Sequence, residues 1–262
     1  MDLATLGAGG LDSWVVAVLL FSAFATAVLS AIVGMAGGMT LLVILLLFVP
    51  PLVAIPLLAV VQFVSNGSRT WVQRRHVRWD YWWRYALPLL PLGWLSLMIA
   101  ERIPPDIARG LIGVFVIVAT WRPHWLFLGS HPGKIRTDRR FFVLGSVIGV
   151  VNVTVGATGP LIAPFFLNLG LSRFAIIGTK AACQMVSHVA KILVFGAVGF
   201  AYDGWAGLLL WMSVLAMAGT AVGSRLLARV DEARFVLLYK AILTLIAISL
   251  VVRHALEAAV SA

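Results

Sequence analysis

Apolar residues dominate this chain in runs long enough to form membrane-spanning helices. A stretch of about 20 apolar residues crosses the hydrocarbon core of a bilayer as an α-helix. The pattern therefore predicts an all-α, polytopic membrane protein. The predicted spans cover residues 11–33, 52–71, 83–100, 107–120, 141–155, 173–198, 205–227 and 235–252.

Two of these runs end at glycine-rich breaks and are followed by short apolar pieces. Residues 34–38 read Gly-Met-Ala-Gly-Gly, and residues 156–160 read Gly-Ala-Thr-Gly-Pro. The pieces that follow, residues 39–49 and 161–169, cover only about half of a bilayer at roughly 1.5 Å per residue. Glycine favours a broken helix at such points. Each break predicts a broken helical hairpin, which either re-enters the membrane or crosses it.

The second half of the chain repeats the first at an offset of 122 residues, without a gap from Val33 to Arg69. Two glycines, a glutamine, a serine and a basic residue coincide, which chance matches between apolar residues do not explain. We expect a first repeat at residues 1–121, a linker at 122–140 and a second repeat at 141–262. The coinciding pairs are Gly34 and Gly156, Gly37 and Gly159, Gln62 and Gln184, Ser65 and Ser187, and Arg69 and Lys191.

Basic residues gather in alternate loops and predict the orientation of the spans. The basic loops 72–84, 122–140 and 225–234 are expected in the cytoplasm, and loops 101–106 and 199–204 outside. Each half then contains a broken hairpin and three full spans, an odd number of crossings. Two such halves are inverted relative to one another, the plan of many secondary transporters.

Polar residues form one face of the helix predicted over residues 173–198. Lys180, Gln184, Ser187, His188 and Lys191 share that face at helical spacing. Ionisable residues inside a membrane mark substrate or ion paths. The alternatives are lysines that extend to the interfaces and a histidine with a purely structural hydrogen bond. If His188 titrates, it is the candidate proton switch.

The first half has a matching polar face made of Gln62, Ser65, Asn66 and Arg69. The glycine breaks would present helix N-termini near Gly38 and Pro160, and such termini attract anions. Apart from Asp12 at the very start of the first span, no Asp or Glu occurs within the apolar spans. The alternative is that the glycines only permit close helix packing. These features predict a site for a small anion that also includes Gly34, Gly37, Gly38, Gly156, Thr158 and Gly159.

Composition excludes several other classes of protein. The net charge of +10 comes mainly from short loops, and no nucleic-acid-binding motif is present. Cys183 is the only cysteine, so neither an intrachain disulfide nor a cysteine-based metal cluster is expected. The spans contain no zinc-type His-Glu motif, no Ser/His/Asp set and no cofactor fingerprint. We therefore expect no enzyme, no cofactor and no bound metal.

Several segments together resemble the TauE/SafE family, whose members are often called sulfite exporters. They are AIVGMAGG at residues 31–38, SNGSR at 65–69, VGATGPLIAPFF at 155–166 and KAACQMVSHVAK at 180–191. The resemblance implies a multi-pass carrier in the bacterial inner membrane for sulfite or an organosulfonate. An anion channel and a sulfonate importer are the alternatives. The interior-negative potential favours export of an anion by about 2.3 kcal/mol per charge per 100 mV. The choice between monomer and homodimer stays open.

Overall fold

The computed structural model describes residues 9–33, 37–100, 102–104, 137–162, 166 and 171–226, with isolated positions between 107 and 122 and between 241 and 252. All regular structure in these residues is helical, which confirms an all-α protein. The helices are α1 (Ser13–Val33), α2 (Gly37–Phe48), α3 (Pro51–Val72), α4 (Trp79–Ala100), α6 (Thr137–Val155), α7 (Gly159–Ile162), α8 (Arg173–Ala197), the 3-10 turn η4 (Asp203–Trp205) and α9 (Ala206–Leu226).

Three of these helices are long and apolar enough to cross a membrane, Ser13–Ala31, Pro51–Val72 and Asp203–Leu226. Their bounds agree with the predicted spans to within about two residues, a normal uncertainty for helix ends. The predicted spans at 107–120 and 235–252, the piece at 161–169 and the linker at 122–140 lie largely outside the described residues. Gly34, at the first glycine break, also lies outside them.

Local sequence explains where the central helices begin. Pro50 is extended, with φ −66° and ψ 159°, and Pro51 is the first residue of α3, where a missing N–H costs no hydrogen bond. Ser172 caps α8 by accepting a hydrogen bond from the Ala175 N–H at 3.3 Å. These two residues fix the starts of α3 and α8, the helices that carry the polar faces.

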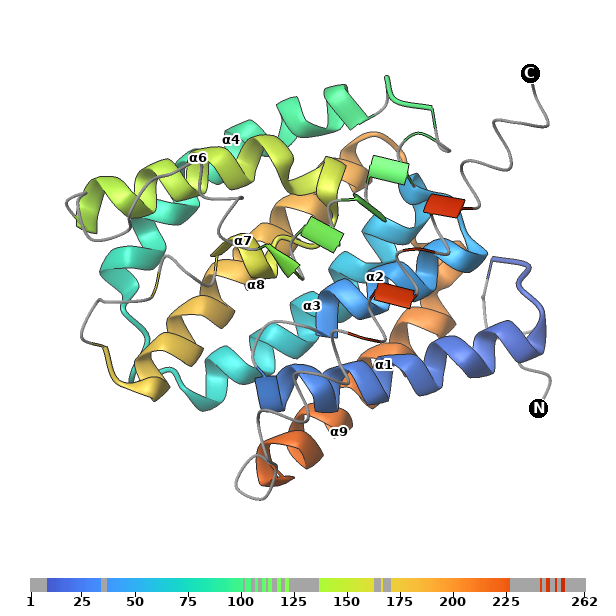
Figure 1. Cartoon of the computed structure of the whole chain (residues 1–262), viewed down its shortest axis with the longest axis horizontal. Coiled ribbons are helices and arrows are strands. Elements are labelled where there is room, and N and C mark those ends of the chain that lie inside the picture. The colour runs from blue at the N-terminus through green and yellow to red at the C-terminus, as the bar shows by residue number, and fades with distance from the viewer. Residues whose placement is uncertain are drawn as a thin grey trace.

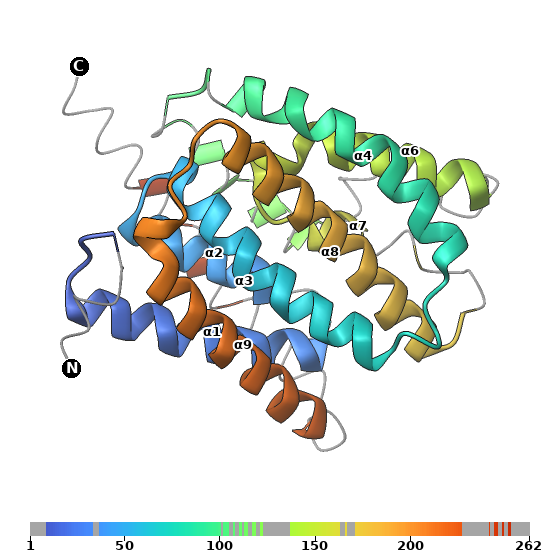
Figure 2. The ribbon, with the colours of Figure 1, turned by 180° about the vertical axis from the view of Figure 1, so that it is seen from behind.

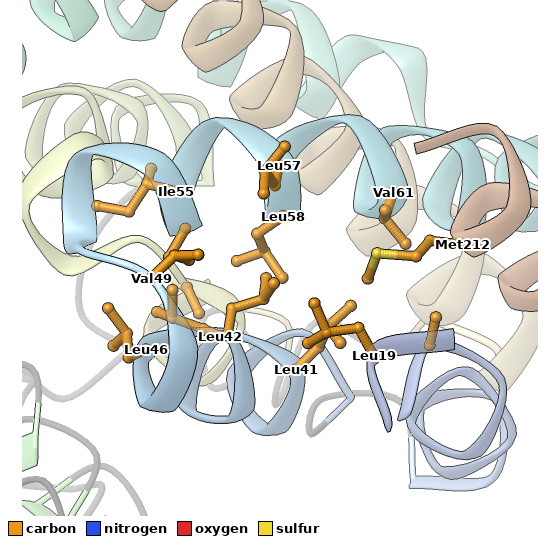
Figure 3. Packing of buried hydrophobic residues seen from close by; sticks show 14 of the residues in the cluster. Leu19, Leu41, Leu42, Leu46, Val49, Ile55, Leu57, Leu58, Val61 and Met212 are labelled. Carbon is orange, nitrogen blue, oxygen red and sulfur yellow. The ribbon is translucent and has the colours of Figure 1, made fainter. Parts of the chain in front are cut away.

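The short helix α2 is the centre of the larger apolar core. Its leucines pack against α3 on one side and against Leu19 of α1 nearby (Figure 3). Leu41, Leu42 and Leu46 are fully buried. This burial surrounds α2 with protein, which a half-length helix needs because lipid cannot satisfy its exposed terminal backbone groups.

The helix contacts pair the two halves of the chain in a symmetric way. Helix α4 packs on α6, α1 packs on α9, α3 packs on α9, and α4 packs on α8. Exchanging α1 with α6, α3 with α8 and α4 with α9 converts this set of contacts into itself. The contact between α3 and α8 lies at the centre and maps onto itself (Figures 1 and 2).

Close contacts at glycines show in which direction the paired helices run. Gly145 and Gly149 of α6 lie against Tyr85 and Leu89 of α4, so these two helices are parallel. In the same way, Gly219 and Gly223 of α9 lie against Phe24 and Val28 of α1. The central pair differs, because Gly178 of α8 lies against Gln73, the residue just after α3, while Met185 lies against Gly67. Helices α3 and α8 are therefore antiparallel.

These directions bring the basic helix ends to one side of the molecule. The C-terminal ends of α3 and α9 and the N-terminal ends of α4 and α6 all face the lower left of Figure 1, with the end of α9 at the bottom and that of α6 at the far left. Those ends carry Arg74, Arg78, Arg139 and Arg225. The turn containing Asp203 lies at the other end, where the Gly204 carbonyl accepts a hydrogen bond from the Gly9 N–H. Which of these two ends faces the cytoplasm stays a prediction from the loops.

Candidate anion-binding site

Three basic side chains are buried on α3 and α8. Arg69 is 8% exposed, Lys180 is 6% exposed and Lys191 is fully buried. The acidic residues with described side chains, Asp12, Asp80 and Asp203, are all exposed. Burying a charge is costly unless a partner or a ligand compensates it. The centre of the described structure is therefore electropositive.

Arg69 extends from α3 to the break between α1 and α2. Its Nη2 donates a hydrogen bond to Ser30 Oγ at 3.2 Å. Its Nε is buried and has no hydrogen-bond partner among the described residues. Ser30 in turn lies against the start of α2, because a Cβ added to Gly37 would come within 2.6 Å of Ser30 Cβ. The guanidinium and the α2 N-terminus thus share one neighbour.

Two amide side chains of α3 lie beside the same helix end. Asn66 Nδ2 donates to the Gln62 carbonyl at 2.9 Å and to Gln62 Oε1 at 3.4 Å. A Cβ added to Gly38 would lie 3.3 Å from Gln62 Cδ. Asn66 therefore orients Gln62 against the α2 N-terminus, whose first N–H groups have no partner within the helix.

Lys180 brings a second positive charge near Arg69 from α8. The two side chains are close enough for their charges to repel one another. The start of α8 is held by the segment that joins α3 to α4, where the Arg78 N–H donates to Thr179 Oγ1 at 2.9 Å. About one turn further along α8, the Ala182 carbonyl accepts a hydrogen bond from Trp82 Nε1 of α4 at 3.0 Å. This segment fixes Lys180 at the basic end of the molecule.

Lys191 lies in a different cluster, at the end of α6. Its Nζ donates to the carbonyl of Gly156, and Asn152 Nδ2 donates to the Ser187 carbonyl at 2.8 Å. His188 lies within electrostatic range of Lys191. His188 Nδ1 and Asn152 Oδ1 are buried without a hydrogen-bond partner among the described residues. The second glycine break is therefore stabilised by a cation of the chain itself.

The two equivalent serines connect helices. Ser65 Oγ of α3 shares a hydrogen bond with Thr220 Oγ1 of α9 at 3.2 Å. Ser187 Oγ of α8 shares one with Tyr85 Oη of α4 at 2.6 Å and donates to the Cys183 carbonyl at 3.0 Å. Under the exchange of the two halves, these pairs of helices correspond.

The structure thus divides the predicted site residues into two clusters. The first contains Arg69, Gln62, Asn66, Gly37 and Gly38 at the α2 N-terminus, with Lys180 electrostatically coupled to Arg69. The second contains Lys191, His188 and Gly156 at the end of α6. Gln184 is half-buried on α8, Thr158 is buried, and Gly159 is the first residue of α7.

Sequence reasoning missed three residues that contact the predicted ones, namely Ser30, Tyr85 and Thr220. A signal was present for one of them. Ser30 lies 122 residues before Asn152, so both are polar residues in the same position of the proposed repeat. Tyr85 and Thr220 carried no such signal, because nothing in their own helices distinguishes them.

Fold and site together define a polytopic helical membrane protein whose buried centre is cationic. The sequence model of the sulfite exporter TauE/SafE family matches residues 19–250, which is most of the chain. The chain belongs to this family, which is a family of transporters. No curated protein and no solved structure matches the chain significantly.

Proposed function

We propose that this protein is a secondary transporter that exports a small sulfur-containing anion, such as sulfite or an organosulfonate, across the bacterial inner membrane. Membership of the TauE/SafE family supports the substrate class. The single observation that carries the proposal is the burial of two basic side chains, Arg69 and Lys180, on the packed helices α3 and α8, with Arg69 bonded to the serine that lies against the α2 N-terminus. A bound anion would offset the cost of burying these charges.

We infer alternating access from the arrangement of the helices. The antiparallel pair α3 and α8 lies between two pairs of parallel helices, and the contacts of α4 with α6, α1 with α9, α3 with α9 and α4 with α8 are preserved as a set when the halves are exchanged. This supports two inverted repeats, residues 1–121 and 141–262, which rock around a central site. On this proposal the protein works in the membrane as a carrier of a small anion and uses no cofactor.

Transport into and out of proteoliposomes tests the proposal. Vesicles with purified protein and unlabelled sulfite inside should accumulate radiolabelled sulfite from outside by exchange. Lys180→Gln should reduce this exchange about tenfold or more, because a charge-assisted contact to the anion is lost. Arg75→Gln, which removes the same charge from an exposed loop residue, is the matched control and should retain the wild-type rate.

Three results would contradict parts of this proposal. Equal exchange by wild type and Lys180→Gln would remove Lys180 from the site. Ion currents far above carrier turnover, without exchange, would show an anion channel. Accumulation that requires an inward proton or sodium gradient would show a sulfonate importer, since uptake of an anion must overcome the membrane potential.

A further inference from the structure

We propose that Arg69, braced by Ser30, is the specificity-determining residue that restricts the site to anions with at least two oxygens on one centre. This inference rests on the proposed transport function and deepens it. One oxygen would accept a hydrogen bond from Arg69 Nε, and a second would accept from the first N–H groups of α2. A single-atom anion such as bromide cannot reach both donors at once.

The Arg69 guanidinium has a buried N–H group that could bind an anion. Arg69 is 8% exposed, and its Nε is buried with no partner among the described residues. A buried N–H without an acceptor costs about 1–3 kcal/mol, and more when the group is charged. Such atoms are rare in folded proteins and mark places where a ligand, an ion or a water belongs. The Arg69 Nε–H is thus available to donate a hydrogen bond to a bound anion.

The bond between Ser30 and Arg69 fixes where that donor points. Ser30 Oγ accepts from Nη2 at 3.2 Å, and Ser30 is itself 6% exposed. A guanidinium is planar, so one hydrogen bond at Nη2 restrains the direction of the Nε–H as well. Elsewhere in this chain, Arg78 uses its Nε and Nη2 together to hold both oxygens of Asp80, at 2.9 and 2.7 Å. That pair shows the geometry that an oxyanion recognises.

The start of α2 supplies the second group of donors. Ser30 contacts Gly37, and the Gln62 side chain lies on Gly38. A side chain on Gly37 would collide with the Thr26 carbonyl, so glycine allows the start of α2 to pack directly against α1 beside Ser30. Helix α2 has 12 residues, long enough for its N-terminus to carry a partial positive charge. Arg69 and α2 therefore approach one small volume from two sides.

Measuring the ratio of two affinities tests the inference. The probes are methanesulfonate, which has three oxygens on sulfur, and bromide, with binding followed by calorimetry on purified protein. Arg69→Lys keeps the charge and removes the guanidinium. It should weaken methanesulfonate binding about tenfold or more, the loss of one charge-assisted hydrogen bond. Bromide binding should change by less than about threefold because the net charge is the same. Arg75→Lys in the exposed loop is the control and should change neither affinity.

Ser30→Ala provides a second test that does not touch a charge. Alanine retains the Cβ that lies on Gly37, so packing should be preserved while the brace on Arg69 is lost. The preference for methanesulfonate over bromide should fall, by less than in Arg69→Lys. This variant decides the matter if Arg69→Lys does not fold.

The outcomes separate this inference from the proposed function. If both variants keep the wild-type ratio while wild type binds methanesulfonate and sulfite, the role of Arg69 is wrong and the transport function stands. If wild type binds neither sulfur anion, both proposals fail. A reduced ratio in both variants supports the inference.

Discussion

Gly156 satisfies two constraints at once, one of backbone conformation and one of packing. Its φ of +73° lies in the left-handed region, which other residues rarely adopt. A Cβ at this position would lie 2.8 Å from Leu42 Cδ2 and 3.2 Å from Ile55 Cγ1. Its carbonyl accepts the hydrogen bond from Lys191. The break after α6 thus joins the backbone of the second half to the apolar core of the first.

Gly156→Ala should therefore destabilise the protein more than the same change at another left-handed glycine. Strain contributes about 1–2 kcal/mol and overpacking about 1–3 kcal/mol. Gly199 has φ +86° and nothing within 4 Å of an added Cβ, so Gly199→Ala should show the strain alone. Thermal unfolding in detergent measures both. Equal losses of stability in the two variants would mean that Leu42 and Ile55 can move away from the added methyl group without a free-energy penalty.

For single residues, the sequence predicted which polar side chains are buried, but it did not predict the hydrogen-bond partner of each one. Spacing placed Arg69 and Lys191 in equivalent positions, and both are buried as a polar face requires. Their hydrogen bonds differ, since Arg69 bonds a serine side chain and Lys191 bonds a backbone carbonyl. Helical periodicity predicts which face of a helix a residue lies on. Its hydrogen-bond partner depends on how helices distant in sequence pack against one another.

Pairs of helices approach one another closely where glycines line one surface. On α6 these are Gly145 and Gly149, and on α9 they are Gly219 and Gly223, each pair one turn apart. Small residues at this spacing let helix backbones come together in a membrane, where dispersion contacts replace the hydrophobic effect. The two contacts, α4 with α6 and α1 with α9, use the same device in the two halves.

Gly145→Ala should weaken the contact between α4 and α6. An added Cβ would lie only 2.1 Å from the Tyr85 carbonyl oxygen, so the helices must separate. We expect a loss of about 1–3 kcal/mol from overpacking. Gly93→Ala in α4 is the matched control, because its nearest neighbour is Ala190 Cβ at 3.7 Å. It should be neutral or stabilising by up to about 1 kcal/mol, the helix preference of alanine.

Unfolding temperatures and yields of the two variants in the same detergent provide the comparison. A Gly145→Ala protein as stable as Gly93→Ala would show that α4 and α6 can separate freely. The bounds of these helices were predictable because apolar runs and prolines define them. Their close approach was not predicted, because a glycine within a helix can indicate either a flexible position or a close helix contact.

For the whole molecule, the relation between the halves determines the mechanism. The parallel pairs and the antiparallel centre place the basic ends of four helices on one side. From the sequence, the offset of 122 residues and the alternation of basic loops predict two inverted halves, and that relation stays a prediction. The span at 107–120 and the last span bear on the same question but lie largely outside the described residues.

Labelling from each side of the membrane tests the orientation directly. Cys183 is buried and should not react with a membrane-impermeant maleimide, so the wild-type chain provides an unreactive background. Arg75→Cys lies in the loop between α3 and α4, and Gly204→Cys lies in the turn at the opposite end with nothing within 4 Å. Both positions are exposed.

In intact cells the reagent should label Gly204→Cys and spare Arg75→Cys, because basic loops remain in the cytoplasm. In inside-out vesicles the pattern should reverse. Labelling of both from the same side would place the two loops on one face of the membrane. That result would contradict the antiparallel arrangement of α3 and α8 as spanning helices, and with it a central site that opens to alternate sides. The opposite pattern in intact cells would keep the inverted halves and reverse the molecule, with the pair Arg69 and Lys180 then nearer to the outside.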